Sequence, residues 1–170
     1  MKIVILMGSP NKNGSTGILV DSFVQGAESA GHTCEIIDVC HANIHPCIGC
    51  VRCGYEGPCV QKDDVETIRW KLLDSDMIVF ASPIYYFTLS AQLQAVIHRT
   101  YSIDIPKNVK KVALIMSSGS AYVYGPAIAQ YYQSIVEYWG VENAGIFTAN
   151  GKQNKSEEKR QELYRFGKSL

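Results

Sequence analysis

The clearest structural signal in the chain is its amino-terminal stretch, Ile3-Val4-Ile5-Leu6-Met7-Gly8-Ser9-Pro10-Asn11-Lys12-Asn13-Gly14-Ser15-Thr16. The first four of these residues form an apolar run that predicts a buried strand. Apolar residues then recur with helical spacing from Ile18 to Ala27, so a helix is expected to begin near Ser15. A strand that leads through a small, polar turn into a helix forms an anion site, because the first N–H groups of a helix lack internal acceptors and the helix dipole adds positive charge there.

The composition of this turn indicates which anion it binds. Ser9, Ser15 and Thr16 offer hydroxyl donors, and Gly8 and Gly14 let the backbone approach a ligand closely. The turn lacks the Lys-Ser/Thr pair of a nucleoside-triphosphate P-loop and the G-x-G-x-x-G spacing of a dinucleotide-binding turn. A single terminal phosphate, such as the one that FMN carries, therefore fits best.

Two alternatives stay open for the same turn. Asp38 ends the next expected strand, where a dinucleotide-binding fold places the acid that binds a ribose. The turn is also compatible with an ordinary strand-to-helix connection that has polar caps and binds nothing.

Length and composition predict one globular domain over residues 1–170. Of the 170 residues, 46% are hydrophobic and 19% are charged, and the formal net charge is zero. This neutral balance argues against nucleic acid or an anionic membrane surface as the main partner. No signal-peptide pattern and no bilayer-spanning apolar run is found, so a cytoplasmic location is predicted.

Strand-like runs alternate with helix-like patterns along the whole chain. Strands are predicted over residues 1–6, 34–39, 77–81, 112–116 and 144–148. Helices are predicted over residues 15–30, from a capping box formed by Asp63 and Glu66 to residue 73, over residues 89–97 and 126–139, and after the cap Ser156. Five strands interleaved with helices predict an α/β fold with a doubly wound parallel sheet, whose ligands bind beyond the carboxyl ends of the strands.

Two further segments are expected to follow strands at the edge where the first turn lies. Ser82-Pro83-Ile84-Tyr85-Tyr86-Phe87-Thr88 carries three consecutive aromatic residues, which favours contact with a flat ring system. The segment 117–125 is rich in small residues that let a ring lie against the backbone, with Tyr122 or Tyr124 as its cover. The alternatives are that the aromatic side chains are buried beneath their loop and that segment 117–125 is a flexible connection.

These motifs resemble those of the NAD(P)H-dependent FMN reductases of the flavodoxin-like superfamily, and especially its iron–sulfur flavoproteins. The resemblance rests on the first turn, on Ser82-Pro83-Ile84-Tyr85-Tyr86 followed by Gln92-Leu93 and Arg99-Thr100, and on Cys47-x-x-Cys50-x-x-Cys53 with Cys59. It covers nearly the whole chain in order and implies the strand order 2-1-3-4-5.

The resemblance also implies which residues bind FMN. Those implied to hold the phosphate are Ser9, Asn11, Gly14, Ser15 and Thr16. Those implied to line the isoalloxazine ring are Pro83, Ile84, Tyr85, Tyr86 and Phe87 on one side and Ser118, Gly119, Ser120 and Tyr122 on the other. No catalytic side chain is assigned, because the reactive atom is N5 of the flavin.

The chain departs from the family pattern at two positions. Many relatives have a basic residue where Asn11 stands, so the affinity for the phosphate is expected either to be lower or to depend more on Lys12. Many relatives also have an acid where His98 precedes Arg99, and His98 is expected to be a surface or interface residue.

A cysteine-rich loop is predicted over residues 40–62. Cys47, Cys50, Cys53 and Cys59 have C-x₂-C-x₂-C-x₅-C spacing, and two-residue gaps let successive thiolates turn toward one centre. Relatives with this spacing bind a [4Fe–4S] cluster, whereas others in the superfamily have similar cysteines and no known cluster. A cluster, a single metal ion such as zinc, and metal-free thiols stay open, while Cys34 and Cys40 are expected to be structural thiols.

The expected function is that of an FMN-dependent oxidoreductase, which passes electrons from NAD(P)H through FMN to a quinone, nitro compound, azo dye, free flavin or redox protein. The alternative is an iron–sulfur flavoprotein that transfers single electrons between partners without a small substrate. A homodimer or homotetramer is predicted, because ten tyrosines are many for this length and six of them lie between residues 101 and 138.

Overall fold

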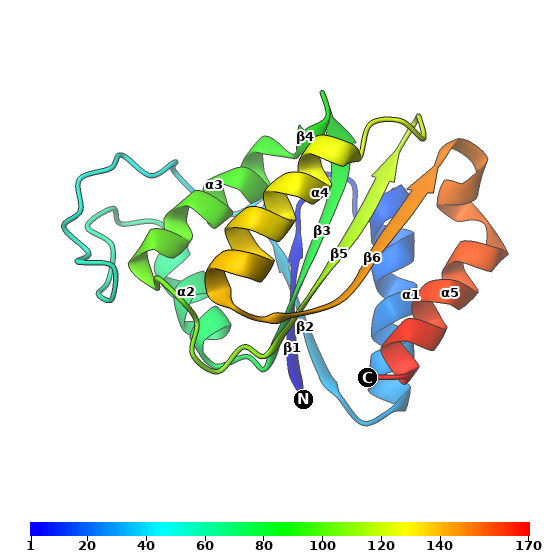
Figure 1. The fold of residues 1–170 in the computed structure, drawn as a ribbon, viewed down its shortest axis with the longest axis horizontal. Helices are drawn as coiled ribbons and strands as arrows, with labels where there is room; N and C mark the ends of the chain where they lie inside the picture. The colour runs from blue at the N-terminus through cyan, green and yellow to red at the C-terminus, as the bar shows by residue number, and fades with distance from the viewer.

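The computed structural model describes residues 1–170 and is built on a parallel sheet with helices on both faces (Figure 1). The strand order is β2-β1-β3-β5-β6, and neighbouring strands are parallel. These strands are β1 (Lys2–Met7), β2 (Thr33–Asp38), β3 (Met77–Tyr85), β5 (Lys111–Ser118) and β6 (Glu142–Asn150). The predicted doubly wound, flavodoxin-like sheet of order 2-1-3-4-5 is confirmed, with β5 and β6 as its fourth and fifth strands.

Two groups of helices cover the two faces of the sheet (Figure 1). One face is covered by α1 (Ser15–Ser29) and α5 (Glu157–Lys168), which pack against each other. The other face is covered by α2 (Val65–Leu73), α3 (Ala91–Arg99) and α4 (Gly125–Tyr131). Shorter helical segments are η1 (Thr100–Ser102), the π-helical η2 (Tyr132–Glu137) and η3 (Gly151–Lys155). None of the helices combines the length and the apolar character that crossing a membrane requires.

The alternation of side chains along the strands builds a separate core on each face. In β1, Val4 and Leu6 belong to the core beneath α2, α3 and α4, whereas Ile3 and Ile5 belong to the core beneath α1 and α5. Residues 77–81 of β3 are at most 1% exposed. A central strand that is buried on both faces needs apolar side chains on both, which explains the unbroken apolar run at residues 77–81.

The carboxyl ends of β1, β3 and β5 meet at one edge of the sheet, because parallel neighbours share their direction. The Gly8 N–H donates to the Ala81 carbonyl at 2.7 Å, and the hydroxyls of Thr16 and Ser117 lie 2.8 Å apart. The first turn, β3 and β5 are therefore joined where the predicted ligand would bind.

The segment after the central strand differs from its prediction as a loop. β3 continues to Tyr85 and then turns back into β4 (Thr88–Leu89), which pairs with it antiparallel. Only Tyr86 and Phe87 form the turn. The reason is that Ser82 and Pro83 still pair with β5, so the strand continues beyond the apolar run.

The capping box predicted at Asp63 and Glu66 is wrong. Asp64 is the N-cap of α2, and the Asp63 carboxylate accepts from the Val65 N–H and from Arg99. Glu66 pairs with Arg69. The Asp63 carboxylate, which the local pattern assigned to the helix start, thus pairs with the buried guanidinium of Arg99, 36 residues away.

Candidate functional site

The turn between β1 and α1 presents main-chain donors that have no acceptor within the protein. The N-cap Gly14 has no side chain to cap the helix, and the first turn of α1 contains no acid. The N–H groups of Ser15, Thr16 and Gly17 form no hydrogen bond with another part of the chain, whereas Ile18 begins the helical ladder by donating to Gly14. Three free N–H groups at a positive helix end form an anion site.

Two glycines give this turn its shape. A Cβ on Gly17 would lie 1.8 Å from the Lys12 carbonyl oxygen, so the turn folds directly onto the first turn of the helix. A Cβ on Gly8 would lie 2.7 Å from Ser90 Oγ and 3.1 Å from the Ala81 carbonyl oxygen. No sequence pattern predicts this role for Gly17, because its constraint comes from a close approach of the backbone.

The side chains predicted to hold a phosphate are partly engaged within the protein. Ser9 is buried and its hydroxyl donates to the Asn11 carbonyl at 3.2 Å, while Asn11 Oδ1 accepts from the Asn13 N–H at 3.1 Å. Thr16 is 1% exposed, and its hydroxyl pairs with Ser117. What Thr16 presents at the helix end is therefore its main-chain N–H.

Lys12 is held to one side of the turn by Asp38. Lys12 Nζ lies 3.3 Å from Asp38 Oδ2, and His41 Nδ1 lies 2.9 Å from the same oxygen. Burial would raise the pKa of Asp38, but the hydrogen bonds from His41 and Lys12 outweigh it and hold the pKa below its usual value. The acid considered as a ribose ligand is thus used to join the turn to the start of the cysteine loop.

The hairpin between β3 and β4 presents aromatic side chains at the same edge. Tyr85 is 56% exposed, Tyr86 97% and Phe87 48%, whereas Pro83 and Ile84 are buried in the sheet. The alternative that the loop buries its aromatic side chains is therefore wrong. Tyr86 and Phe87 have φ values of 51° and 68°, in the left-handed region that aromatic residues rarely adopt.

The segment after β5 forms the third side of the edge. Tyr122 is 91% exposed, whereas Tyr124 is buried and donates to the Ala149 carbonyl at 2.6 Å, so only Tyr122 can act as a cover. Ser118 is fixed by Asn154, whose Nδ2 donates to the Ser118 carbonyl at 2.8 Å. Asn154 was missed because it comes from η3, 36 residues further along the chain.

The cysteine loop extends from the sheet beside α3 and contains no regular helix or strand (Figure 1). All six cysteines are free thiols. The loop does not bring three or more possible metal-ligating side chains together around one point. Burial raises the pKa of both Cys34 and Cys40 to about 11, which agrees with structural thiols.

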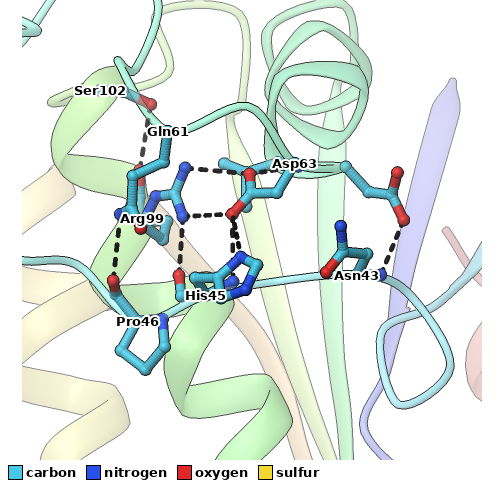
Figure 2. A network of polar contacts seen from close by, with 9 residues as sticks. Asn43, His45, Pro46, Gln61, Asp63, Arg99 and Ser102 are labelled. Carbon is cyan, nitrogen blue, oxygen red and sulfur yellow. Dashed lines mark hydrogen bonds and ion pairs between the residues drawn. The ribbon is translucent and has the colours of Figure 1, made fainter.

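A buried ion pair closes the base of the cysteine loop (Figure 2). Arg99 donates to Asp63 at 2.7 and 3.1 Å and to the His45 carbonyl at 2.6 Å, and both charged side chains are at most 1% exposed. Gln61 Nε2 donates to the Pro46 carbonyl at 3.0 Å. The two ends of the loop are thereby fastened to each other and to the end of α3.

Comparisons with known proteins show what this chain is similar to. It is 29% identical over 156 residues to an iron-sulfur flavoprotein from Archaeoglobus fulgidus, covering 89% of this chain and 69% of that protein. It is 26% identical over 161 residues to the Bacillus subtilis protein YwqN, named as an NAD(P)H-dependent FMN-containing oxidoreductase, covering 89% of this chain and 86% of that protein. Against three further iron-sulfur flavoproteins, the matched region spans only 49–54% of their length.

A solved structure with the same fold is an NAD(P)H:quinone oxidoreductase from Methanothermobacter marburgensis. It has a TM-score of 0.78 and 18% sequence identity, and the match covers 100% of this chain and 96% of that one. The sequence profile described as NADPH-dependent FMN reductase matches residues 1–142. With most of its length matched by that profile, the protein belongs to the NADPH-dependent FMN reductase family.

Proposed function

We propose that this FMN-dependent NAD(P)H oxidoreductase holds the FMN phosphate on the turn between β1 and α1 and the isoalloxazine ring between the β3–β4 hairpin and the segment after β5. FMN, when bound, supplies the redox chemistry, taking two electrons from NAD(P)H and delivering them to an acceptor. The chain supplies the groups that bind and orient the cofactor. The place agrees with the fold, because β1 and β3 flank the switch point where doubly wound sheets bind ligands.

The observation that carries this proposal is the set of free N–H groups of Ser15, Thr16 and Gly17 at the start of α1. A terminal phosphate satisfies such donors and the helix dipole together. The Lys12 backbone packs so tightly on Gly17 that the turn keeps a fixed shape. With Asn11 neutral, Lys12 is the cation nearest in sequence to these donors.

The exposed rings of Tyr85, Tyr86, Phe87 and Tyr122 support a small, flat electron acceptor, of the quinone, nitro, azo or free-flavin class. Aromatic faces pack other rings in offset or edge-to-face arrangements. The proposed residues for the isoalloxazine ring are those predicted from the sequence, except that Pro83 and Ile84 contribute main chain because their side chains are buried.

A comparison of FMN with riboflavin tests the phosphate assignment, since riboflavin differs from FMN only in lacking the phosphate. We expect Gly17→Ala to weaken FMN binding on the order of tenfold or more and to leave riboflavin binding nearly unchanged, because the added Cβ displaces the turn. Gly125→Ala, which lies outside the phosphate turn and whose Cβ meets nothing within 4 Å, is the control and is expected to leave the ratio of FMN to riboflavin affinity unchanged. Fluorescence titration measures both affinities.

Two results of this titration contradict the proposal. Equal losses of FMN and riboflavin affinity in Gly17→Ala would move the phosphate away from this turn. A parent protein that binds neither flavin would remove the function itself.

An iron–sulfur flavoprotein is the second candidate function. Four cysteines with ferredoxin-like spacing in one loop favour it, and the Gly49 N–H donates to Cys47 Sγ at 3.4 Å, a bond that also suits a metal-bound thiolate. The donor chemistry fits a [4Fe–4S] cluster at Cys47, Cys50, Cys53 and Cys59, although the thiols do not converge in this structure. Anaerobic purification followed by iron and sulfide analysis decides between a loaded and a metal-free loop.

We also propose a homodimer and a cytoplasmic location. Tyr101 and Tyr138 are 58% and 59% exposed and line a cleft of about 440 Å³ that also includes His98. Exposed aromatic clusters of this kind often become interfaces. Six free thiols agree with a reducing compartment.

A further inference from the structure

Lys12 has its backbone fixed at the start of α1 and its ammonium paired with Asp38. The Lys12 carbonyl oxygen packs against Gly17, so the lysine stem begins beside the free N–H groups of the first helical turn. Lys12 Nζ lies 3.3 Å from Asp38 Oδ2, and the lysine side chain is 73% exposed. A lysine ammonium is a point charge on a flexible four-carbon stem, so it can change partner while its backbone stays in place.

Asp38 is placed by the sheet and not by Lys12. It ends β2 and lies in register with Met7, which ends β1. The N–H of the next residue, Val39, donates to the Met7 carbonyl at 3.2 Å. Because Met7 directly precedes the turn between β1 and α1, the two paired strands hold the Asp38 carboxylate at a fixed position beside this turn.

The Asp38 carboxylate has other donors that remain if Lys12 leaves. The N–H groups of Cys40 and His41 both donate to Oδ1 at 3.2 Å, and His41 Nδ1 lies 2.9 Å from Oδ2. Loss of one partner therefore does not leave the carboxylate without hydrogen bonds. An ion pair with an exposed lysine also contributes little to stability, so Lys12 is free to exchange.

A phosphate at the start of α1 competes with Asp38 for the lysine. A phosphate monoester carries about −1.5 to −2 charges at pH 7, which is more than a carboxylate carries. The first turn of α1 has no acid, and Asn11 is neutral, so Lys12 is the one charged side chain of this turn. Any attraction that Asp38 exerts on Lys12 is lost from the binding of the phosphate.

We propose that Lys12 changes partner when FMN binds, from Asp38 to the phosphate, and that Asp38 thereby limits how strongly the protein prefers FMN over riboflavin. The inference rests on the proposed function, which places the phosphate on the turn between β1 and α1. Lys12 is then a phosphate ligand. Asp38 acts only through Lys12, so it is a positioning residue that sets the specificity for the phosphorylated flavin.

Opposite effects of two substitutions test this exchange, with fluorescence titration of FMN and of riboflavin as the readout. We expect Lys12→Met to weaken FMN binding on the order of tenfold, because a hydrogen bond between charged groups is lost. We expect Asp38→Asn to strengthen FMN binding about two- to fivefold, because the competing ion pair is removed. Riboflavin binding stays near that of the parent in both variants. Asparagine keeps Oδ1 as the acceptor for the Cys40 and His41 N–H groups.

Two further variants separate competition for Lys12 from simple repulsion between Asp38 and the phosphate. In the double variant Lys12→Met, Asp38→Asn, the gain from Asp38→Asn is expected to disappear, because no lysine is left to release. Glu35→Gln is the matched control. It removes one negative charge from the same strand, but Glu35 pairs with Lys71 of α2, so the ratio of FMN to riboflavin affinity is expected to stay near the parent value.

Three results overturn the inference. The first is an FMN affinity of Asp38→Asn that is equal to or below that of the parent. The second is a gain that persists undiminished in the double variant, and the third is an equal gain in Glu35→Gln.

Failure of the proposed function gives a different result. If Gly17→Ala loses FMN and riboflavin affinity equally, the phosphate lies elsewhere and this inference falls with the proposed site. If the preference for FMN depends on Gly17 but not on Asp38, the proposed site stands and only the exchange of Lys12 is removed.

Discussion

Asp63 shows how one side chain can serve several parts of the structure. Its carboxylate is fully buried and accepts from Arg99 and from the N–H groups of His45 and Val65. It therefore connects the start of α2, the cysteine loop and the end of α3. Removing one partner of such a pair leaves a buried charge without compensation, which typically costs about 3–5 kcal/mol.

Asp63→Asn is expected to destabilise the protein and to flatten its response to acid. Burial would raise the pKa of Asp63, but the hydrogen bonds from Arg99, His45 and Val65 hold the pKa below its usual value. A depressed folded-state pKa gives stability that is complete above about pH 4 and is lost as the pH falls through the folded value. Urea unfolding of the parent and Asp63→Asn from neutral pH to about pH 2 measures this, and parallel curves would contradict it.

The β3–β4 hairpin is an element whose sequence conflicts with its backbone. A two-residue turn with positive φ at both positions normally contains Asn-Gly, because side chains strain it. Here Tyr86 and Phe87 occupy it, held by the pairing of Ile84 with Leu89 and of Tyr85 with Thr88. Backbone strain of this kind is found mostly at functional sites. The strained turn therefore agrees with a role for the two exposed rings in binding a ligand at this edge.

Phe87→Gly is expected to raise stability by about 1 kcal/mol, because glycine adopts the left-handed conformation without strain. The same change is expected to weaken FMN binding severalfold, since a ring is lost from the proposed site. Tyr55→Gly is the control: Tyr55, in the cysteine loop, also has a positive φ, but its ring contacts Tyr101 of η1, away from the proposed flavin edge. Thermal unfolding and FMN titration measure both effects, and an unchanged FMN affinity in Phe87→Gly would remove this ring from the site.

At the scale of the whole molecule, α3 connects the proposed flavin edge to the base of the cysteine loop. Ser90 caps the start of α3 and its N–H donates to Ser82 Oγ, close to the proposed flavin edge. Arg99 ends the same helix at the base of the cysteine loop. Nine residues of helix span about 14 Å, so one rigid element sets the spacing between the two candidate redox regions.

The proposed dimer face is the cleft lined by Tyr101, Tyr138 and His98, near the end of α3. We expect the double variant Tyr101→Glu, Tyr138→Glu to shift the protein toward the monomer, because two charges would be buried at the interface. Trp70→Glu on α2 is the control, since Trp70 is equally prominent at 61% exposed. Sedimentation of the FMN-loaded proteins measures the shift, and a monomeric parent would refute the proposed face.

The sequence was sufficient for the features that depend on local pattern. The unbroken apolar run in β3, the helical spacing after Gly14 and the glycines near element ends indicate where strands and helices form, because burial on both faces and helix capping leave periodic marks. The predicted strand order came from family resemblance rather than from that pattern. The meeting of the three segments at the carboxyl edge follows from the pattern of strands and helices, because parallel strands end at the same edge of a sheet.

Other features depend on residues that meet only after folding. Asp63 pairs with Arg99, 36 residues away, and Glu66 does not form the predicted capping box with it, because a buried guanidinium requires a counter-charge. Asn154 and the Thr16–Ser117 pair gained their roles in the same way, through contacts made across the sheet edge, whereas Gly17 gained its role from the close approach of the Lys12 carbonyl within the turn. Local periodicity records which face of an element is buried, whereas the partner of a buried polar group is set by the three-dimensional packing.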